Sequence, residues 1–175
     1  MSASRKVLLV THTRRLEALA AALETCQKLV AAGITPVMSA ADHAELSTYA
    51  DDLPAAHGGG PLPIEIQLLD RDCNLAELEL AMVLGGDGTI LKAAEVVRGV
   101  EVPLMGINLG HVGFLAESER DGLAEAVERV VAKDYVVKER MTLDVRVFVG
   151  GSEVYRTWAL NEATVEKSER ERMLE

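Results

Sequence analysis

The sequence predicts an α/β fold, a doubly wound and mostly parallel sheet that is followed by the first strands of a β-rich second domain. Short apolar runs alternate with amphipathic helical patterns over residues 1–139, which is typical of a parallel sheet with helical crossovers. Glycines and polar residues gather after the apolar runs, at the positions where such sheets bind ligands. From residue 140 the pattern changes to alternation of single residues, so residues 140–175 are assigned to the second domain.

Each element of the first domain follows from its local pattern. Short apolar runs that end at polar residues or glycines predict strands at residues 6–10, 35–40, 64–70, 78–84 and 102–108. Apolar residues at helical spacing predict helices at residues 14–32, 41–49, 89–98 and 119–133. The first helix is expected to end at Gly33, and the Gly/Pro-rich segment 53–63 indicates a surface loop.

The second domain is predicted to open with an antiparallel hairpin. Apolar residues alternate with mostly polar ones from Met141 to Val149, and Gly150 and Gly151 then turn the chain into a second strand. A two-stranded hairpin is only marginally stable by itself. We therefore expect the natural protein to continue beyond residue 175 and this chain to be an incomplete part of it.

Charge and composition exclude several classes of function. The formal net charge of −10 argues against a broad surface for nucleic acid or anionic membranes, because phosphate backbones are bound by clustered Lys and Arg. Cys26 and Cys73 lie far apart with no Cys/His cluster around them, so neither a zinc site nor a disulfide framework is predicted. The N-terminal apolar run is too short for a signal peptide or a membrane span, which predicts a cytoplasmic protein with reduced thiols.

The segment GGDGT, residues 85–89, carries the main functional signal. Glycine lets a ligand approach the main chain, and Gly85, Gly86 and Gly88 are expected to expose backbone N–H groups at a helix N-terminus, which favours an anion. Asp87 would repel a phosphate there unless it accepts a proton from a hydroxyl or holds a metal, and its alternative role is a helix N-cap. Neither the P-loop pattern nor G-x-G-x-x-G occurs, so a P-loop enzyme and an ordinary dinucleotide dehydrogenase are not indicated.

Other candidates for ligand binding follow the glycine loop. Lys92 lies one turn beyond it and could reach a diphosphate, although an isolated helical lysine is usually just solvated. Asn108 begins the segment NLGHVGFL, whose alternative role is a structural turn. Asn161 and Glu162 interrupt a strand-like run, and adjacent polar residues of this kind can bind a base edge and a ribose hydroxyl.

Together these segments resemble the NAD kinase family, in which a GGDGT loop, an N-x-G-x-x-G-F-L segment and an N-E pair recur in this order. The resemblance covers nearly the whole chain, from KVLLVTHT to NEATVE. It implies that Asp87 is the catalytic residue, which orients the 2'-hydroxyl of the adenosine ribose of NAD and accepts its proton. The ligand-binding residues that it implies are Gly86, Asp87 and Gly88 in the loop, Lys92 near the diphosphate, Asn108 in the second segment, and Asn161 with Glu162 at the adenosine.

The resemblance further implies an enzyme of NADP biosynthesis that uses ATP or inorganic polyphosphate as its phosphoryl donor. Phosphoryl transfer depends on alignment and charge neutralisation, so a divalent cation, Mg²⁺, is expected with the donor, and no residue is assigned as a metal ligand. A homo-oligomer, a dimer or tetramer, is implied, with no nucleic-acid or membrane partner. The family's T-G-S-T-A-Y-type segment is absent, so we expect little or no activity from these 175 residues alone.

Two alternatives remain open, because the GGDGT loop also occurs in lipid kinases and, in variant form, in phosphofructokinases. In the first, the protein is a lipid or sugar kinase. In the second, it is a nucleotide-binding module without catalysis. A ligand screen with NAD, NADP, diacylglycerol and fructose 6-phosphate distinguishes these functions.

Overall fold

The computed structural model describes residues 4–12, 15–54, 60–109, 116–160 and 162–164, and of residues 116–121 it describes the backbone alone. Contacts within the chain divide it into two compact units, Met1–Val136 and Val137–Glu175. The predicted boundary between domains, after residue 139, stays a prediction.

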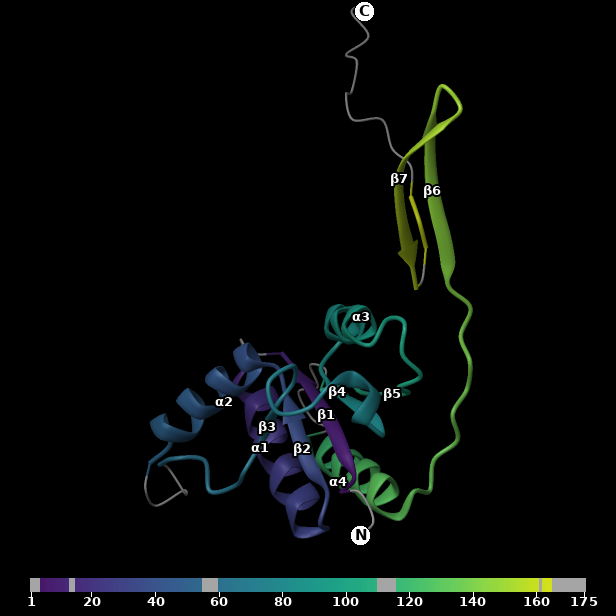
Figure 1. Cartoon of the computed structure of the whole chain (residues 1–175). Coiled ribbons are helices and arrows are strands. Elements are labelled where there is room, and N and C mark those ends of the chain that lie inside the picture. Colours follow the sequence, from purple (N-terminus) through teal and green to yellow (C-terminus); the bar gives the residue numbers. More distant parts are fainter. Residues whose placement is uncertain (1–3, 13–14, 55–59, 110–115, 161, 165–175) are drawn as a thin grey trace, which may run out of the picture. The chain divides into compact units, whose positions relative to one another are not determined.

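The first unit is a five-stranded parallel sheet with helices on both faces (Figure 1). Its strands are β1 (Lys6–Thr11), β2 (Thr35–Met38), β3 (Gln67–Leu68), β4 (Leu80–Leu84) and β5 (Leu104–Ile107). Its α-helices are α1 (Leu16–Ala31), α2 (Ala40–Asp52), α3 (Asp87–Val96) and α4 (Ala116–Ala132). The strand order is β3-β2-β1-β4-β5 and each neighbouring pair is parallel, so the predicted doubly wound α/β class is confirmed.

The central strands bury both of their faces. Along β1, Val7 and Leu9 join one hydrophobic core with α1 and α4, while Leu8 and Val10 join a second core with α3. All residues of β4 are buried, and they divide between the two cores in the same alternating way. Strands without an exposed face have no need of polar residues, which is why the sequence shows continuous apolar runs here.

The direction in which strands are added reverses between β1 and β4. From β1 the chain moves outward through β2 to β3, whereas from β4 it moves in the opposite direction to β5. Because crossovers between parallel strands are right-handed, α1 and α2 cover one face of the sheet and α3 covers the other. The carboxyl ends of β1 and β4 lie side by side, with Thr11 paired to Leu84. This edge is the topological switch point, where doubly wound sheets bind ligands.

The third strand is shorter than the sequence predicts. The expected strand 64–70 is reduced to Gln67–Leu68, which pair with the last residues of β2. Pro36 lies next to those partners and has no backbone N–H to extend the ladder. At the other end Asp70 adopts a φ of 67°, a left-handed conformation that turns the chain out of the sheet.

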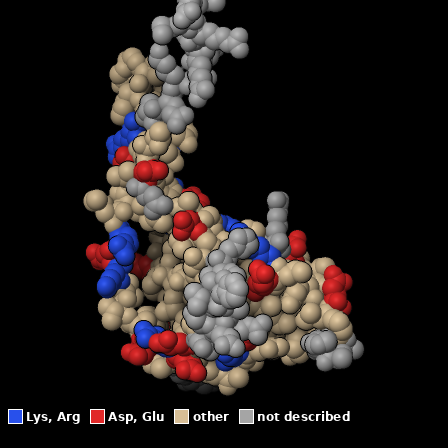
Figure 2. Space-filling view, turned by 180° about the vertical axis from the view of Figure 1, so that it is seen from behind, with Lys and Arg blue, Asp and Glu red and all other residues tan. Residues whose placement is uncertain are grey.

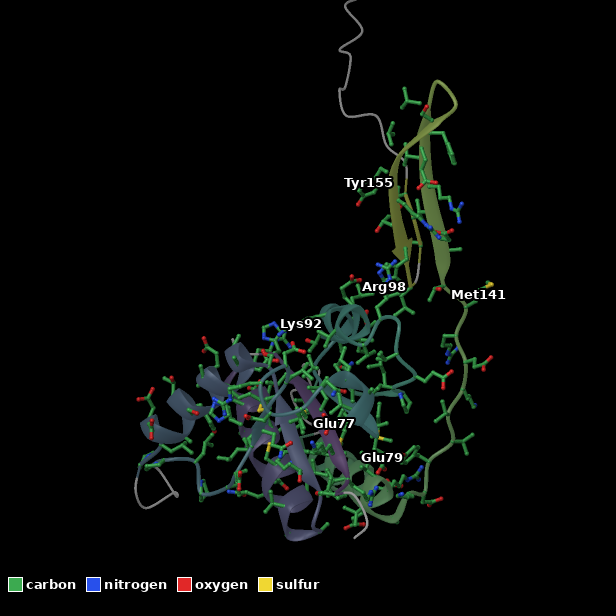
Figure 3. All side chains as sticks on the ribbon, viewed as in Figure 1. Glu77, Glu79, Lys92, Arg98, Met141 and Tyr155 are labelled. Atoms are coloured by element: carbon green, nitrogen blue, oxygen red, sulfur yellow. The ribbon has the colours of Figure 1, made fainter. Side chains whose placement is uncertain are left out.

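A polar cluster around Glu79 closes the amino edge of the sheet; Figure 3 marks Glu79 at this edge and Lys92 at the other. Arg5 donates two hydrogen bonds of 2.6 Å to the Glu79 carboxylate and two more to the carbonyls of Val130 and Val131 at the end of α4. Tyr135 Oη also donates to Glu79, at 3.0 Å. The hydrogen bonds from Arg5 lower the pKa of the Glu79 carboxyl. The cluster therefore joins the residue before β1, the residue before β4 and the end of α4.

The second unit is an antiparallel hairpin, as predicted. β6 (Leu143–Val149) pairs with β7 (Ser152–Ala159). Gly150 and Gly151 form the turn with φ angles of 58° and 84°, which suit the two-residue turns that match strand twist. Several large apolar side chains of the hairpin are exposed, namely Leu143, Val147, Phe148, Val149, Val154 and Tyr155.

Both cysteines are buried free thiols. Burial raises the pKa of Cys26 to about 12, so this thiol stays protonated and unreactive at neutral pH. Within the described ranges, every helix is either too short or too polar to cross a membrane.

Candidate phosphate-binding site

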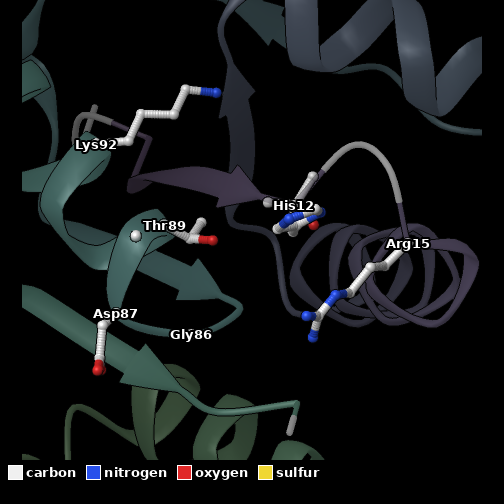
Figure 4. Close-up of a pocket in the computed structure, with 8 residues that line it drawn as sticks. His12, Arg15, Gly86, Asp87, Thr89 and Lys92 are labelled. Carbon is white, nitrogen blue, oxygen red and sulfur yellow. The ribbon is translucent and has the colours of Figure 1, made fainter. Parts of the chain in front are cut away.

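A pocket of about 530 Å³ opens at the switch point between β1 and β4 (Figure 4). Its walls come from the two segments that leave these strands, one after β1 and one at the start of α3. The lining residues are Thr11, His12, Arg15, Gly86, Asp87, Gly88, Thr89 and Lys92. The structure therefore brings together the candidate residues of the glycine loop and its helix, Gly86, Asp87, Gly88 and Lys92.

The glycine loop supplies unpaired backbone N–H groups. In the described part of the chain, the N–H groups of Gly86, Asp87 and Gly88 have no backbone acceptor, as expected at the start of a helix. Together with the helix dipole, these groups favour an anion. The expectation for Gly85 is wrong, because its N–H donates to the carbonyl of Ile107 at 3.0 Å and so belongs to the sheet.

Gly85 is required for a different reason. Its φ is +156°, and a Cβ at this position would lie 2.5 Å from Thr89 Oγ1. Thr89 is buried in the first turn of α3 and cannot move aside easily. A side chain at residue 85 would therefore push the start of α3 away from the sheet, so this glycine fixes where the helix begins.

Asp87 is the first residue of α3, and its side chain is exposed in the pocket. Gly86 is the N-cap of this helix and no side chain caps it, so the N-cap role for Asp87 and the predicted helix start at residue 89 are both wrong. A carboxylate in the first turn still stabilises the helix through the dipole. An exposed carboxylate beside amides that favour an anion can accept a proton from a hydroxyl that attacks this anion.

Lys92 lies in the pocket, but it has a partner that local sequence patterns do not reveal. Its Nζ donates to Asp42 Oδ1 at 2.8 Å, and the side chains are 50% and 2% exposed, respectively. Asp42 lies in the first turn of α2, where the Oγ of the N-cap Ser39 accepts a hydrogen bond from its N–H. A carboxylate as buried as this needs a counter-charge, and Lys92 provides it. Figure 4 shows Lys92 and Asp87 extending from α3 in opposite directions.

The segment after β1 forms the other wall of the pocket, and it is absent from the predicted site. Thr11 is buried, and its Oγ1 donates to the carbonyl of Ala18 at 3.2 Å, which ties the end of β1 to α1. Arg15 is the exposed N-cap residue of α1, and Figure 4 shows its side chain extending toward the glycine loop. The signal that could have revealed this wall is the polar run THTRR directly after the first strand, at the edge where ligands bind.

Of the remaining predicted residues, the structure describes Asn108 and Glu162. Asn108 is exposed and directly follows β5, so it lies at the same edge of the sheet as the glycine loop. Glu162 is exposed and belongs to the second unit. Asn161 and the segment 110–115, which holds most of the second motif, lie outside the described residues.

The charged residues of the pocket do not form a metal cage. Among the described residues, no group of three or more His, Cys, Asp or Glu could hold a metal ion. On the face shown in Figure 2, Lys and Arg side chains are interspersed with Asp and Glu. An anionic ligand therefore depends on the local amides and cations of the pocket.

The fold and the pocket define a class, the doubly wound α/β proteins in which a glycine loop and a helix N-terminus form an anion site at the switch point. The model of the ATP-NAD kinase N-terminal domain matches residues 7–135. The chain therefore belongs to the ATP-NAD kinase family. This result confirms the family resemblance predicted from the three sequence segments.

Comparison with individual relatives agrees with the family. The chain is 54% identical to the NAD kinase of Leifsonia xyli over 100% of its own length and 54% of the relative's. It is 48% identical to the NAD kinase of Thermobifida fusca and 45% identical to that of Mycobacterium tuberculosis, covering 51% and 55% of those proteins. The chain thus spans about half the length of the curated relatives it matches.

A solved structure supports the fold. The crystal structure of yeast NADH kinase complexed with NADH superposes with a TM-score of 0.62 at 20% identity. The match covers 89% of this chain and 46% of the yeast protein.

Proposed function

We propose that this chain is part of an NAD kinase, which transfers a phosphoryl group from ATP or inorganic polyphosphate to the 2'-hydroxyl of the adenosine ribose of NAD, giving NADP. One observation carries the proposal. Asp87 is exposed beside the unpaired N–H groups of the glycine loop, in a pocket at the switch point of a member of the ATP-NAD kinase family. A base next to an anion site is what the transfer of a phosphoryl group to a hydroxyl requires.

The proposed chemistry assigns a role to each group of the loop. With ATP, the 2'-oxygen of NAD attacks the γ-phosphorus while Asp87 accepts the hydroxyl proton. The bond from the γ-phosphorus to the oxygen that bridges the β-phosphate breaks, and ADP leaves with the electron pair. The N–H groups of Gly86 and Gly88 bind phosphate oxygens and hold the donor in line with the hydroxyl.

Other ligand contacts are proposed from the family motifs. Asn108 contacts ligand at the end of β5, Asn161 with Glu162 binds the adenosine, and Lys92 lies near a diphosphate while it stays paired with Asp42. A divalent cation, Mg²⁺, would come with the donor and would neutralise phosphate charge there, and no residue of the chain is assigned as its ligand. A cytoplasmic location and a homo-oligomeric state stay predictions.

A hybrid protein tests the proposed function. In the hybrid, this chain replaces the matching half of the Leifsonia xyli NAD kinase and is joined to the remaining half of that protein. The chain and the half that it replaces are 54% identical. We expect the hybrid to produce NADP from NAD and ATP, measured with an NADP-specific dehydrogenase, and to be stabilised in thermal-shift assays by NAD and not by diacylglycerol or fructose 6-phosphate. A folded hybrid that binds NAD but forms no NADP would contradict the proposal and leave a nucleotide-binding module.

A further inference from the structure

We propose that Arg15 supplies the positive charge that binds phosphate in this pocket, and that Asp42 compensates the charge of Lys92. The inference rests on the proposed function, because it names the residue that holds a phosphate group at the same site. Lys92 and Arg15 both line the pocket, yet their surroundings differ.

Lys92 already has an anionic partner. Its Nζ lies 2.8 Å from Asp42 Oδ1, and the Asp42 side chain is 2% exposed. If Lys92 left Asp42 to bind a phosphate, a buried carboxylate would lose its counter-charge, which is strongly unfavourable. Lys92 therefore stays with Asp42, and the pair presents almost no net charge to a ligand.

Arg15 has no such partner among the described residues. It is exposed at the N-cap of α1, and no described carboxylate or carbonyl accepts a hydrogen bond from its guanidinium. Binding a phosphate therefore breaks no ion pair between Arg15 and a described residue. The planar fork of a guanidinium also matches two phosphate oxygens at once, which a lysine ammonium does not.

The position of Arg15 fits this role. Its side chain extends from the wall after β1 toward the glycine loop, whereas Lys92 extends from α3 in the direction opposite to Asp87 (Figure 4). A phosphate bound to the N–H groups of Gly86 and Gly88 thus lies between the loop and Arg15. The pocket then binds it from two walls, with backbone amides on one and a guanidinium on the other.

Isothermal titration of the chain with inorganic tripolyphosphate tests the inference. We expect Arg15→Gln to weaken binding about tenfold or more, since charge-assisted hydrogen bonds to phosphate are strong. Lys92→Gln should change the affinity for tripolyphosphate less than about threefold, because Asp42 already compensates the charge of Lys92. Lys28→Gln serves as the matched control, since Lys28 pairs with Glu24 on the surface of α1 and does not line the pocket.

Asp42→Asn should strengthen tripolyphosphate binding, whereas Arg15→Gln should weaken it. Removing the carboxylate uncovers the charge of Lys92, so tripolyphosphate should bind about two- to fivefold more tightly. This gain should vanish in the double variant with Lys92→Gln. Ser39→Ala removes the N-cap hydrogen bond of α2 without touching the ion pair, and it therefore controls for any loosening of that helix.

The outcomes separate this inference from the proposed function. If Lys92→Gln abolishes tripolyphosphate binding and Arg15→Gln leaves it unchanged, the inference is overturned, although the pocket is still a phosphate site. No binding by the unsubstituted chain overturns the phosphate site and the inference together. A parallel titration with NAD identifies the phosphate: an effect of Arg15→Gln on tripolyphosphate alone assigns Arg15 to the donor, and an effect on NAD assigns it to the acceptor.

Discussion

At the level of single residues, Gly85 and Gly88 belong to the same loop but have different structural roles. Gly85 is part of the sheet through its N–H and lies under Thr89, whereas Gly88 is in the first turn of α3 with open space around it. A glycine in a helix is usually unfavourable compared with alanine. Gly88 is therefore explained by ligand access, and Gly85 by packing.

Gly85→Ala should destabilise the chain. The new Cβ would lie 2.5 Å from Thr89 Oγ1 at a φ of +156°, so we expect the free energy of unfolding to fall by about 1–3 kcal/mol. Urea denaturation of the purified chain, followed by circular dichroism, measures this change.

Gly88→Ala is the matched control for that experiment. A Cβ at residue 88 meets no atom within 4 Å, so the free energy of unfolding should stay the same or rise by up to about 1 kcal/mol. If both variants lost stability equally, the packing of Thr89 against Gly85 would not be what fixes the start of α3.

At the scale of secondary-structure elements, the cluster of Arg5 and Glu79 attaches the end of α4 to the amino edge of the sheet. The hydrogen bonds from Arg5 lower the pKa of the Glu79 carboxyl. A carboxyl whose pKa is lower in the folded state stabilises the fold at pH values above its unfolded pKa, and this stabilisation is lost as the pH falls through the folded pKa.

Glu79→Gln should therefore reduce stability in a pH-dependent way. At pH 7 we expect a loss of about 1–3 kcal/mol in the free energy of unfolding, because Arg5 loses its charged acceptor in a partly buried site. The difference from the unsubstituted chain should shrink as the pH falls into the acid range. Urea denaturation at a series of pH values measures this, and Glu125→Gln, which breaks an exposed pair on α4, is the control. A difference that does not depend on pH would contradict the account.

The hairpin of β6 and β7 should be the least stable sheet of the chain. Two strands alone are marginal, and six of its large apolar side chains are exposed. We expect its backbone amides to exchange with deuterium faster than those of β1 and β4, and the apparent molar mass from light scattering to rise with protein concentration. Exchange in β6 as slow as in β4 would show that the hairpin has a stable partner.

Much of the first unit was predictable from sequence because its central strands bury both faces. Continuous apolar runs mark β1 and β4 directly, and GGDGT is a local motif. The short β3 was not predictable in length, since the limit set by Pro36 appears only once β2 and β3 are paired. The partner of Lys92 is 50 residues away in sequence, and Arg15 reaches the pocket because β1 and β4 are neighbours. Both depend on strand order, which no local pattern contains.

At the scale of the whole molecule, the negative net charge is consistent with an anion site that is confined to one pocket. A net charge of −10 disfavours phosphate binding over a broad surface, so we expect phosphates to bind at the switch point, where the loop amides and Arg15 line the pocket and Asp42 compensates the charge of Lys92. The predicted adenosine-binding pair belongs to the second unit. Phosphoryl transfer is thus proposed for residues of the first unit and adenosine binding for residues of the second.

The central claim is that Asp87 accepts the proton of the attacking hydroxyl, and Asp87→Asn in the hybrid protein tests it most directly. Turnover of NAD and ATP to NADP should fall by at least ~100-fold, since loss of a general base costs about 10²- to 10⁴-fold. NAD affinity, measured by isothermal titration, should change little, and Asp51→Asn on α2 controls for the loss of one negative charge. Near-normal turnover of Asp87→Asn would contradict the claim and leave Asp87 with only its favourable interaction with the dipole of α3.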